Sequence, residues 1–316
     1  MIQTIRETRV IETIPKQSAL SLRRLLARHM ARTAGKTVMS PENSRQIARK
    51  RMDAGADRLP TPDDVRIQKT EISGLSALTF TPDERRPGLL LFLHGGGYCL
   101  GSAKSHRPLV TRLAKALRIN AVSVDYRLAP EHVFPCAVED GTAALNWAMG
   151  HSDGPVLIAG DSAGGGLTLA SLLRQREQGR PLPQGVYLIS PWTDLTASGD
   201  SAKTRAKADP MLKPEWLASG AELYLENTPA DTPEASPLFA DLSGLPPMFI
   251  QTGDDEILRD DSIRFAQKLE QAGVPVQCEI WKALWHDFPL FAPLLPEADL
   301  ALERLTDWAE PILSAD

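Results

Sequence analysis

The sequence has 316 residues, 42% of them hydrophobic and 24% charged, with a formal net charge of −5. Such a chain is long enough to bury one substantial core, and its charge balance excludes a strongly basic, nucleic-acid-binding protein. No stretch reaches the ~18 apolar residues of a membrane span, and the first 20 residues lack the apolar run of a signal peptide. The three cysteines, Cys99, Cys136 and Cys278, lack the paired spacing of a zinc or redox site. We therefore expect a cytoplasmic protein without nucleic-acid partners or stable membrane association.

The first 60 residues differ in charge from the rest, with 13 Lys and Arg against 5 Asp and Glu. Within them, residues 20–30 alternate leucines and basic residues at helical spacing. Such a helix lies either on an anionic membrane surface or on its own protein. We favour the second arrangement because most amphipathic helices pack in this way.

From about residue 77 the sequence alternates short apolar runs with amphipathic stretches, a pattern typical of an α/β fold with a mainly parallel sheet between helices. The apolar runs predict strands at 88–93, 119–124, 156–159, 186–189, 248–251 and 276–281. The amphipathic stretches predict helices near 108–117, 137–149, 165–175, 260–271 and 298–309.

Two regions interrupt this alternation. Residues 1–60 are basic and predicted to be helical, and residues 192–246 are rich in Pro, Ser, Ala and Asp around a predicted helix at 214–226. We interpret both as parts of a cap. The catalytic core is then formed by residues 61–191 and 247–316.

The sequence Gly160-Asp161-Ser162-Ala163-Gly164 lies between a predicted strand and a predicted helix. This G-x-S-x-G pattern in this context is typical of a nucleophile elbow, in which the two glycines permit a strained turn that exposes the serine hydroxyl. The glycines that follow lack the lysine of a phosphate-binding loop and the spacing of a dinucleotide-binding loop. We therefore predict that Ser162 is a nucleophile.

A second glycine-rich segment, His94-Gly95-Gly96-Gly97, follows the predicted strand at 88–93. Glycines after a strand allow backbone amides to approach a substrate oxygen closely, as in the H-G-G-G oxyanion element. We predict that the amides of Gly95, Gly96 and Ala163 form the oxyanion hole. His94 is expected to have a structural role.

A nucleophilic serine needs a base, and α/β-hydrolases provide the acid and then the histidine after the serine in the chain. His286 follows the last predicted strand and is the last histidine of the sequence, whereas three of the others precede Ser162 outside any suitable motif. The remaining two lie in the N-terminal region and in the oxyanion segment. We therefore predict that His286 is the base.

Several carboxylates follow the predicted strand at 248–251 and compete for the role of the acid that orients His286. Asp260 and Asp261 are expected to cap the helix that follows. The residues alone leave the choice open among Asp254, Asp255 and Glu256.

Over residues 70–290 the chain resembles the hormone-sensitive-lipase-like bacterial esterases, known as family IV. The resemblance rests on His94–Gly97, Asp125–His132, Phe134-Pro135, Gly160–Gly164 and Ser190-Pro191-Trp192. The family's D-P-L-x-D motif aligns with Glu256-Ile257-Leu258-Arg259-Asp260 and implies that Glu256 is the acid, 30 residues before His286. Asp255 is the alternative.

The resemblance also implies that the two irregular regions form a helical cap over a pocket for short acyl chains, and that the segment Tyr126–Glu131 supports the site from below. Because acyl pockets are mainly apolar and aromatic, we select Tyr98, Leu100, Trp216 and Leu217 as wall residues. A homodimer is implied as well. We expect it to form through the apolar strand at 276–281, which would otherwise expose a sheet edge.

Three hypotheses for function follow. The first is a carboxylesterase that acts on small-molecule esters through an acyl-enzyme, without metal or organic cofactor. The second keeps this machinery for a lactone, an O-acetyl group or an amide. The third is a non-catalytic binder, because plant gibberellin receptors resemble this family but lack the catalytic histidine. The presence of both Ser162 and His286 favours an enzyme.

Overall fold

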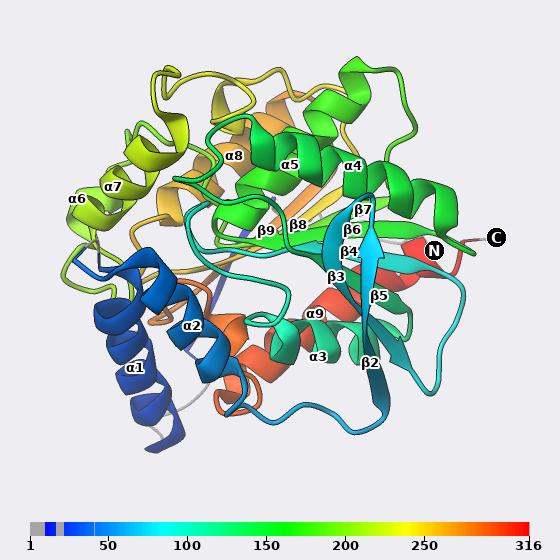
Figure 1. Cartoon of the computed structure of the whole chain (residues 1–316), viewed down its shortest axis with the longest axis horizontal. Coiled ribbons are helices and arrows are strands. Elements are labelled where there is room, and N and C mark those ends of the chain that lie inside the picture. The colour runs from blue at the N-terminus through cyan, green and yellow to red at the C-terminus, as the bar shows by residue number, and fades with distance from the viewer. Residues whose placement is uncertain (1–9, 17–21, 41, 316) are drawn as a thin grey trace, which may run out of the picture.

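The computed structural model describes residues 10–16, 22–40 and 42–315, and these residues build one nine-stranded sheet (Figure 1). The strand order is β1-β9-β8-β7-β6-β4-β5-β3-β2, and the pairs β2–β3 and β3–β5 are antiparallel while the others are parallel. The strands are β1 (Ile11–Ile14), β2 (Val65–Ile72), β3 (Leu75–Pro82), β4 (Leu89–Leu93), β5 (Asn120–Val124), β6 (Val156–Asp161), β7 (Gly185–Ile189), β8 (Met248–Gly253) and β9 (Val276–Trp281). The predicted α/β fold is confirmed.

Helices cover both faces of the sheet, as Figure 1 shows. One face is covered by α3 (Arg107–Leu117) and α9 (Pro296–Leu313), and the other by α4 (Cys136–His151), α5 (Ala163–Glu177) and α8 (Arg259–Gln271). The central strands β4, β6, β7 and β8 are buried along their whole length, which explains why the sequence is mainly apolar there. The six strands and five helices predicted from residue 77 onward are present, and no end deviates by more than four residues.

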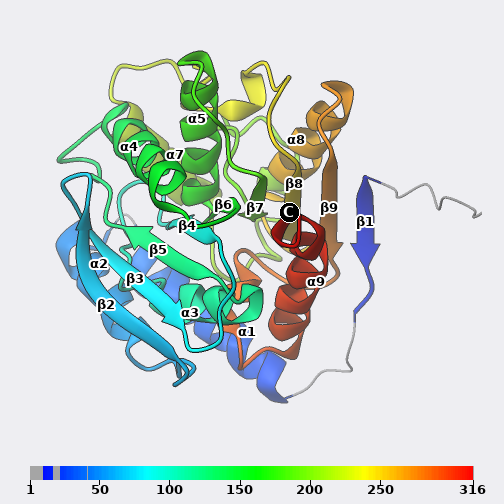
Figure 2. The same cartoon turned by 90° about the vertical axis from the view of Figure 1, so that its right-hand side faces the viewer.

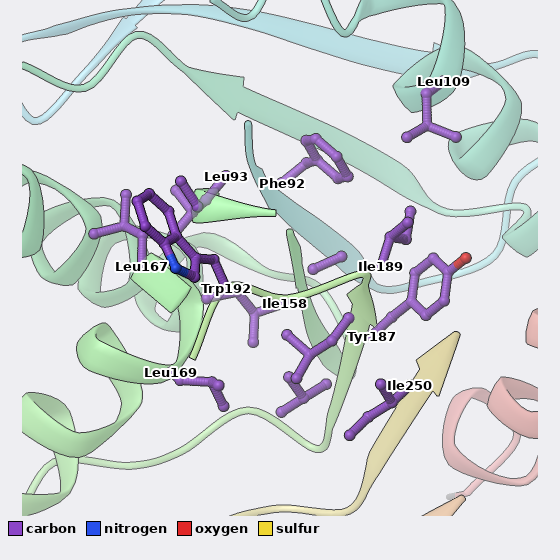
Figure 3. Close-up of a cluster of buried hydrophobic side chains, with 14 of the residues drawn as sticks. Phe92, Leu93, Leu109, Ile158, Leu167, Leu169, Tyr187, Ile189, Trp192 and Ile250 are labelled. Carbon is purple, nitrogen blue, oxygen red and sulfur yellow. The ribbon is translucent and has the colours of Figure 1, made fainter. Parts of the chain in front are cut away.

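Side chains from these central strands form a core with residues of the helix after the nucleophile elbow. Figure 3 shows Ile158, Ile189 and Ile250 beside Leu167 and Leu169 of α5. All five side chains are fully buried. The carboxyl ends of the parallel strands are therefore fixed in a rigid frame, and the loops at these ends carry the residues predicted to be functional.

The N-terminal region contains a strand that the sequence analysis missed. β1 pairs in parallel with β9, with Ile11 opposite Cys278 and Ile14 opposite Trp281. Figure 2 shows β1 beside β9 at the border of the sheet. The prediction that residues 276–281 form a free edge for a homodimer is therefore wrong, because a segment of the same chain satisfies the backbone groups of that edge.

Most of the remaining helices gather beyond one end of the sheet (Figure 1). The N-terminal region contributes α1 (Leu22–Ala34), η1 (Gly35–Met39) and α2 (Arg45–Ala56), and the region 192–246 contributes α6 (Ser201–Thr204), α7 (Pro214–Leu225) and η2 (Pro237–Phe239). A short turn, η3 (Phe288–Phe291), follows the predicted catalytic histidine. The two predicted cap regions thus lie at the same end of the sheet, although β1 belongs to the sheet and not to a helical cap.

Helix α1 packs on its own protein, as expected, but not through its leucines. Ala27 and Ala31 are fully buried, whereas Leu22, Leu25 and Leu26 are 83%, 49% and 49% exposed. Residues 20 and 21 of the predicted amphipathic segment lie outside the described residues. None of the helices in the described ranges is both long and apolar enough to cross a bilayer.

Candidate active site

Ser162 occupies a sharp turn between the end of β6 and the start of α5. Its backbone angles, φ 52° and ψ −121°, are strained for a residue with a side chain. A Cβ atom on Gly160 would collide with the carbonyl of Gly164, and one on Gly164 would collide with the carbonyl of Leu93. The turn therefore requires glycine at both flanking positions, as the G-x-S-x-G pattern predicts.

His286 faces this serine from the loop after β9. Its Nε2 atom lies 2.9 Å from the Ser162 hydroxyl oxygen, and both side chains are buried. Its Nδ1 atom lies 3.7 Å from Glu256 Oε1, longer than a hydrogen bond but close enough for an ion pair. The structure thus brings together Ser162, His286 and Glu256 in the order hydroxyl, imidazole and carboxylate.

Glu256 is held in place by two donors. Its Oε2 atom accepts hydrogen bonds from the Ser190 hydroxyl at 2.8 Å and from the Gly253 amide at 2.9 Å. Ser190 Oγ in turn accepts a hydrogen bond from the amide of Asp287 at 3.2 Å. One hydroxyl therefore links the loop that carries Glu256 to the loop that carries His286.

The other two candidate acids point away from His286. Asp255 forms an ion pair with Arg28 of α1 at 3.4 Å, and its side chain is 25% exposed, whereas Glu256 is fully buried. Asp254 pairs with Arg205, Arg259 and Lys282. Among these three carboxylates, Glu256 is the one placed to orient the imidazole.

Asp260 and Asp261 do not act as the predicted helix caps. The Asp260 carboxylate accepts a hydrogen bond from the amide of Ser201 at 2.8 Å. The Asp261 carboxylate accepts hydrogen bonds from the amides of Thr193 and Asp194, both at 2.9 Å. Both carboxylates thus hold residues of the region 192–246 against the core, and the N-cap position of α8 has no side-chain hydrogen bond.

Another carboxylate, that of Asp287, was not considered in the sequence analysis and lies at the reactive side of His286. Asp287 Oδ2 is 2.9 Å from His286 Nε2, so this nitrogen has both Ser162 and Asp287 as neighbours. Burial disfavours a charged imidazole, but the carboxylates of Asp287 and Glu256 hold the pKa of His286 well above its usual value. Burial raises the pKa of Asp287 in turn.

The predicted oxyanion hole needs one correction. The amide of Gly95 donates a hydrogen bond to Asp161 Oδ1 at 2.9 Å, and an amide carries one proton, so Gly95 has no donor left for a substrate. Within the described residues, the amides of Gly96 and Gly97 donate no such bond, and both glycines line the cavity at Ser162. Ala163 begins α5, where helical amides lack partners within the helix.

Polar side chains beneath the glycine segment fix its position. Asp161 also contacts His106, with 3.1 Å between Oδ2 and Nε2, in a fully buried pair. The Tyr126 hydroxyl donates to the carbonyl of His94 at 2.6 Å, and the two rings stack with 4.2 Å between centroids. These contacts agree with the supporting roles predicted for His94 and for the segment that begins at Tyr126.

A narrow cavity of about 40 Å³ opens at Ser162. Three of the four predicted wall residues, Leu100, Trp216 and Leu217, line it. Tyr98 does not, because its buried ring stacks on Tyr224 with 3.8 Å between centroids. The other lining residues are Met39, Arg45, Gly96, Gly97, Cys99, Trp192, Leu212 and Gly220. Some of these lining residues lie beside a recognised motif. The others could not be predicted from the sequence, because the segments that carry them are far apart in the chain and meet only when it folds.

Comparison with known proteins identifies the family of this chain. Residues 90–290 match the family described as alpha/beta hydrolase fold. A solved esterase from the bacterial hormone-sensitive lipase (HSL) family superposes with a TM-score of 0.88 at 36% identity, over 93% of this chain and 99% of that one. The chain belongs to the bacterial HSL family of α/β hydrolases. The resemblance inferred from the motifs is thereby confirmed.

Several enzymes named as hydrolases or esterases are similar to this chain over most of their length. An esterase of Acinetobacter venetianus is 36% identical over 283 residues, which cover 88% of this chain and 91% of the relative. An acetyl-hydrolase of Streptomyces hygroscopicus is 44% identical over 216 residues, which cover 68% and 72%. A carboxylesterase of Mycobacterium tuberculosis is 35% identical over 229 residues, covering 68% and 71%.

Proposed function

We propose that this HSL-family protein is a carboxylic ester hydrolase in which Ser162 is the nucleophile, His286 the base and Glu256 the orienting acid. The observation that carries the proposal is the 2.9 Å contact between His286 Nε2 and a serine hydroxyl on a strained elbow. A hydroxyl is a weak nucleophile unless a base removes its proton, and here the base is already within hydrogen-bonding distance. The names of the relatives support the same reaction.

In this mechanism His286 takes the proton of Ser162 as its oxygen attacks the ester carbonyl. The tetrahedral intermediate places its negative oxygen near the amides of Gly96, Gly97 and Ala163, in which Gly97 takes the place predicted for Gly95. The imidazolium then protonates the departing alcohol, and an acyl-enzyme forms. Water, activated by the same imidazole, releases the acid and restores Ser162.

A fluorophosphonate probe tests this proposal directly, because it reacts with an activated serine and not with ordinary hydroxyls. The probe should label the purified protein at Ser162, and peptide mapping should identify that residue. Prior treatment with a slowly turned-over ester should protect it. An unlabelled, folded protein would instead support the non-catalytic binder.

Short acyl groups fit this site better than long ones. The cavity of about 40 Å³ is far below the roughly 300 Å³ or more that enclose a drug-sized ligand. Relatives named acetyl-hydrolase support a small acyl group. A lactone, an O-acetyl group or an amide would use the same atoms, so these remain alternatives for the natural bond.

We expect p-nitrophenyl esters with acyl chains of roughly C2–C8 to be hydrolysed with higher kcat/KM than longer ones, because the enclosed apolar wall cannot accommodate a long chain without moving. A series from acetate to palmitate, measured at equal detergent concentration, checks this. Efficient release of palmitate from an emulsified triglyceride would contradict an enclosed pocket.

The pH dependence should show the protonation of His286. The imidazole must be neutral to act as base, and its pKa lies above its usual value of about 6.5, so kcat/KM should rise with pH to a midpoint above 6.5. Activity is lost as pH falls through that midpoint. An activity maximum near pH 4 would exclude His286 as the base.

The variant Asp287→Asn should move this midpoint to lower pH, because it removes a negative charge 2.9 Å from Nε2 that stabilises the imidazolium. Asp255→Asn is a matched control, since the same change at a carboxylate that pairs with Arg28 should leave the midpoint in place. A midpoint that is identical in the wild type and in Asp287→Asn would show that Asp287 does not act on His286.

We further propose that the two helical regions at one end of the sheet form the cap.

We also propose that the protein functions in the cytoplasm. Cys99, Cys136 and Cys278 are all free thiols, which supports a reducing compartment. The homodimer implied by the family resemblance would use a surface other than β9, since β1 covers that strand.

A further inference from the structure

Arg45 is an unusual member of the cavity wall at Ser162. It is the one charged side chain among the described residues that line this cavity, and the other lining residues are apolar or uncharged. A negatively charged substrate group would therefore meet a cation in this space and no opposing carboxylate. Arg45 is the first residue of α2, in the predicted cap region.

No group in the described part of the chain neutralises Arg45. Within the described ranges it forms no ion pair and donates no hydrogen bond, although it is half-buried. Arg49, one helical turn later, shows the contrast: it donates to the carbonyls of Cys99 and Ala129 and binds Glu131 through both carboxylate oxygens. Arg49 therefore attaches α2 to the loops that contain Cys99 and Ala129, and Arg45 is not needed for this structural role.

Local structure also disfavours a cation at this position. Arg45 is the first residue of α2, where the helix dipole is positive, and the first turn contains no acidic residue. Its charge nevertheless acts inside the cavity: burial raises the pKa of the neighbouring Cys99 thiol to about 11, and Arg45 opposes this rise. A cation at a helix N-terminus that forms no ion pair with the described residues is unfavourable for stability, and such unfavourable residues are typical of functional sites.

We propose that the ester substrates of this site carry a carboxylate, which Arg45 binds while Ser162 attacks the ester carbonyl. The planar guanidinium donates two parallel hydrogen bonds to a carboxylate, and in a half-buried, mostly apolar site this contact selects strongly for the anion. This inference rests on the proposed ester hydrolysis and specifies its substrate class.

Two matched substrate pairs test the inference. The first places the carboxylate in the acyl part, as mono-p-nitrophenyl adipate against p-nitrophenyl hexanoate. The second places it in the alcohol part, as 4-carboxyphenyl butyrate against phenyl butyrate. We expect the wild type to prefer the carboxylate in at least one pair. Arg45→Gln should lower kcat/KM for that substrate by about tenfold more than for its neutral partner, mainly through KM.

Lys50→Gln removes a positive charge from the exposed side of the same helix and should leave both ratios unchanged. Raising the ionic strength to about 1 M should reduce the preference of the wild type but not that of Arg45→Gln. An absence of preference in both pairs, or equal losses for both members in Arg45→Gln, would overturn the inference. These outcomes differ from a failure of the proposed ester hydrolysis, in which the wild type would not hydrolyse the neutral esters either.

Discussion

Replacing Ser162 or His286 with alanine is expected to reduce kcat by several orders of magnitude, on the order of 10⁴- to 10⁶-fold. Each change removes one end of the 2.9 Å contact through which the proton leaves the nucleophile. Because the residues act as a unit, the double variant should be little slower than either single variant. Steady-state hydrolysis of p-nitrophenyl acetate by purified variants, with the background rate subtracted, measures this effect.

A matched control separates catalysis from folding. Ser171 is also a buried serine of α5, but its hydroxyl donates to the Leu167 carbonyl of the same helix at 2.8 Å. Ser171→Ala makes the same chemical change away from His286 and should retain most activity. Circular dichroism and thermal unfolding should show all three variants folded. Near-normal turnover by folded Ser162→Ala or His286→Ala would exclude the proposed mechanism.

The parts of this fold that could be predicted from sequence are those with a local cause. Strand β4 is apolar throughout and β6 is apolar from Val156 to Ala159, because both strands are buried. Ser162 lies at a turn that only flanking glycines permit. The position of His286 after the last strand follows from the fixed order of this fold. In each case a few consecutive residues contain the physical reason.

The parts that were missed depend on contacts between distant residues. β1 has four residues, and its partner strand lies more than 250 residues later in the chain, so no local pattern identifies the pairing. The glycine run predicts accessible amides, but it does not show that the amide of Gly95 donates a hydrogen bond to the distant Asp161 side chain. Arg45 reaches the cavity only because α2 packs over the loop that contains Cys99.

Asp287 was missed for a different reason. It follows the catalytic histidine directly, and neighbouring residues in an extended segment usually point in opposite directions. Here Asp287 has a left-handed backbone with φ 53°, which turns its carboxylate back toward His286 Nε2. The residue type and its position were visible in the sequence, but the backbone conformation that makes it important was not.

Glu256→Gln is expected to reduce kcat by up to about 10⁴-fold while the protein remains folded. The glutamine oxygen can still accept hydrogen bonds from Ser190 and from the Gly253 amide. Its NH₂ group then faces His286 Nδ1 and donates to it, which favours the tautomer with the proton on Nε2. That tautomer cannot take the proton of Ser162, and the charge that stabilises the imidazolium is lost as well.

Asp255→Asn makes the same acid-to-amide change one residue earlier and is expected to be much milder, because that carboxylate pairs with Arg28 at 3.4 Å and is partly exposed. The measurement is kcat for both variants at several pH values, since a triad acid affects turnover at every pH at which His286 is neutral. Loss of most activity in Asp255→Asn with retention in Glu256→Gln would assign the role to Asp255. Equal, modest losses would mean that the crowded carboxylates substitute for one another, and the triad would then have no single acid.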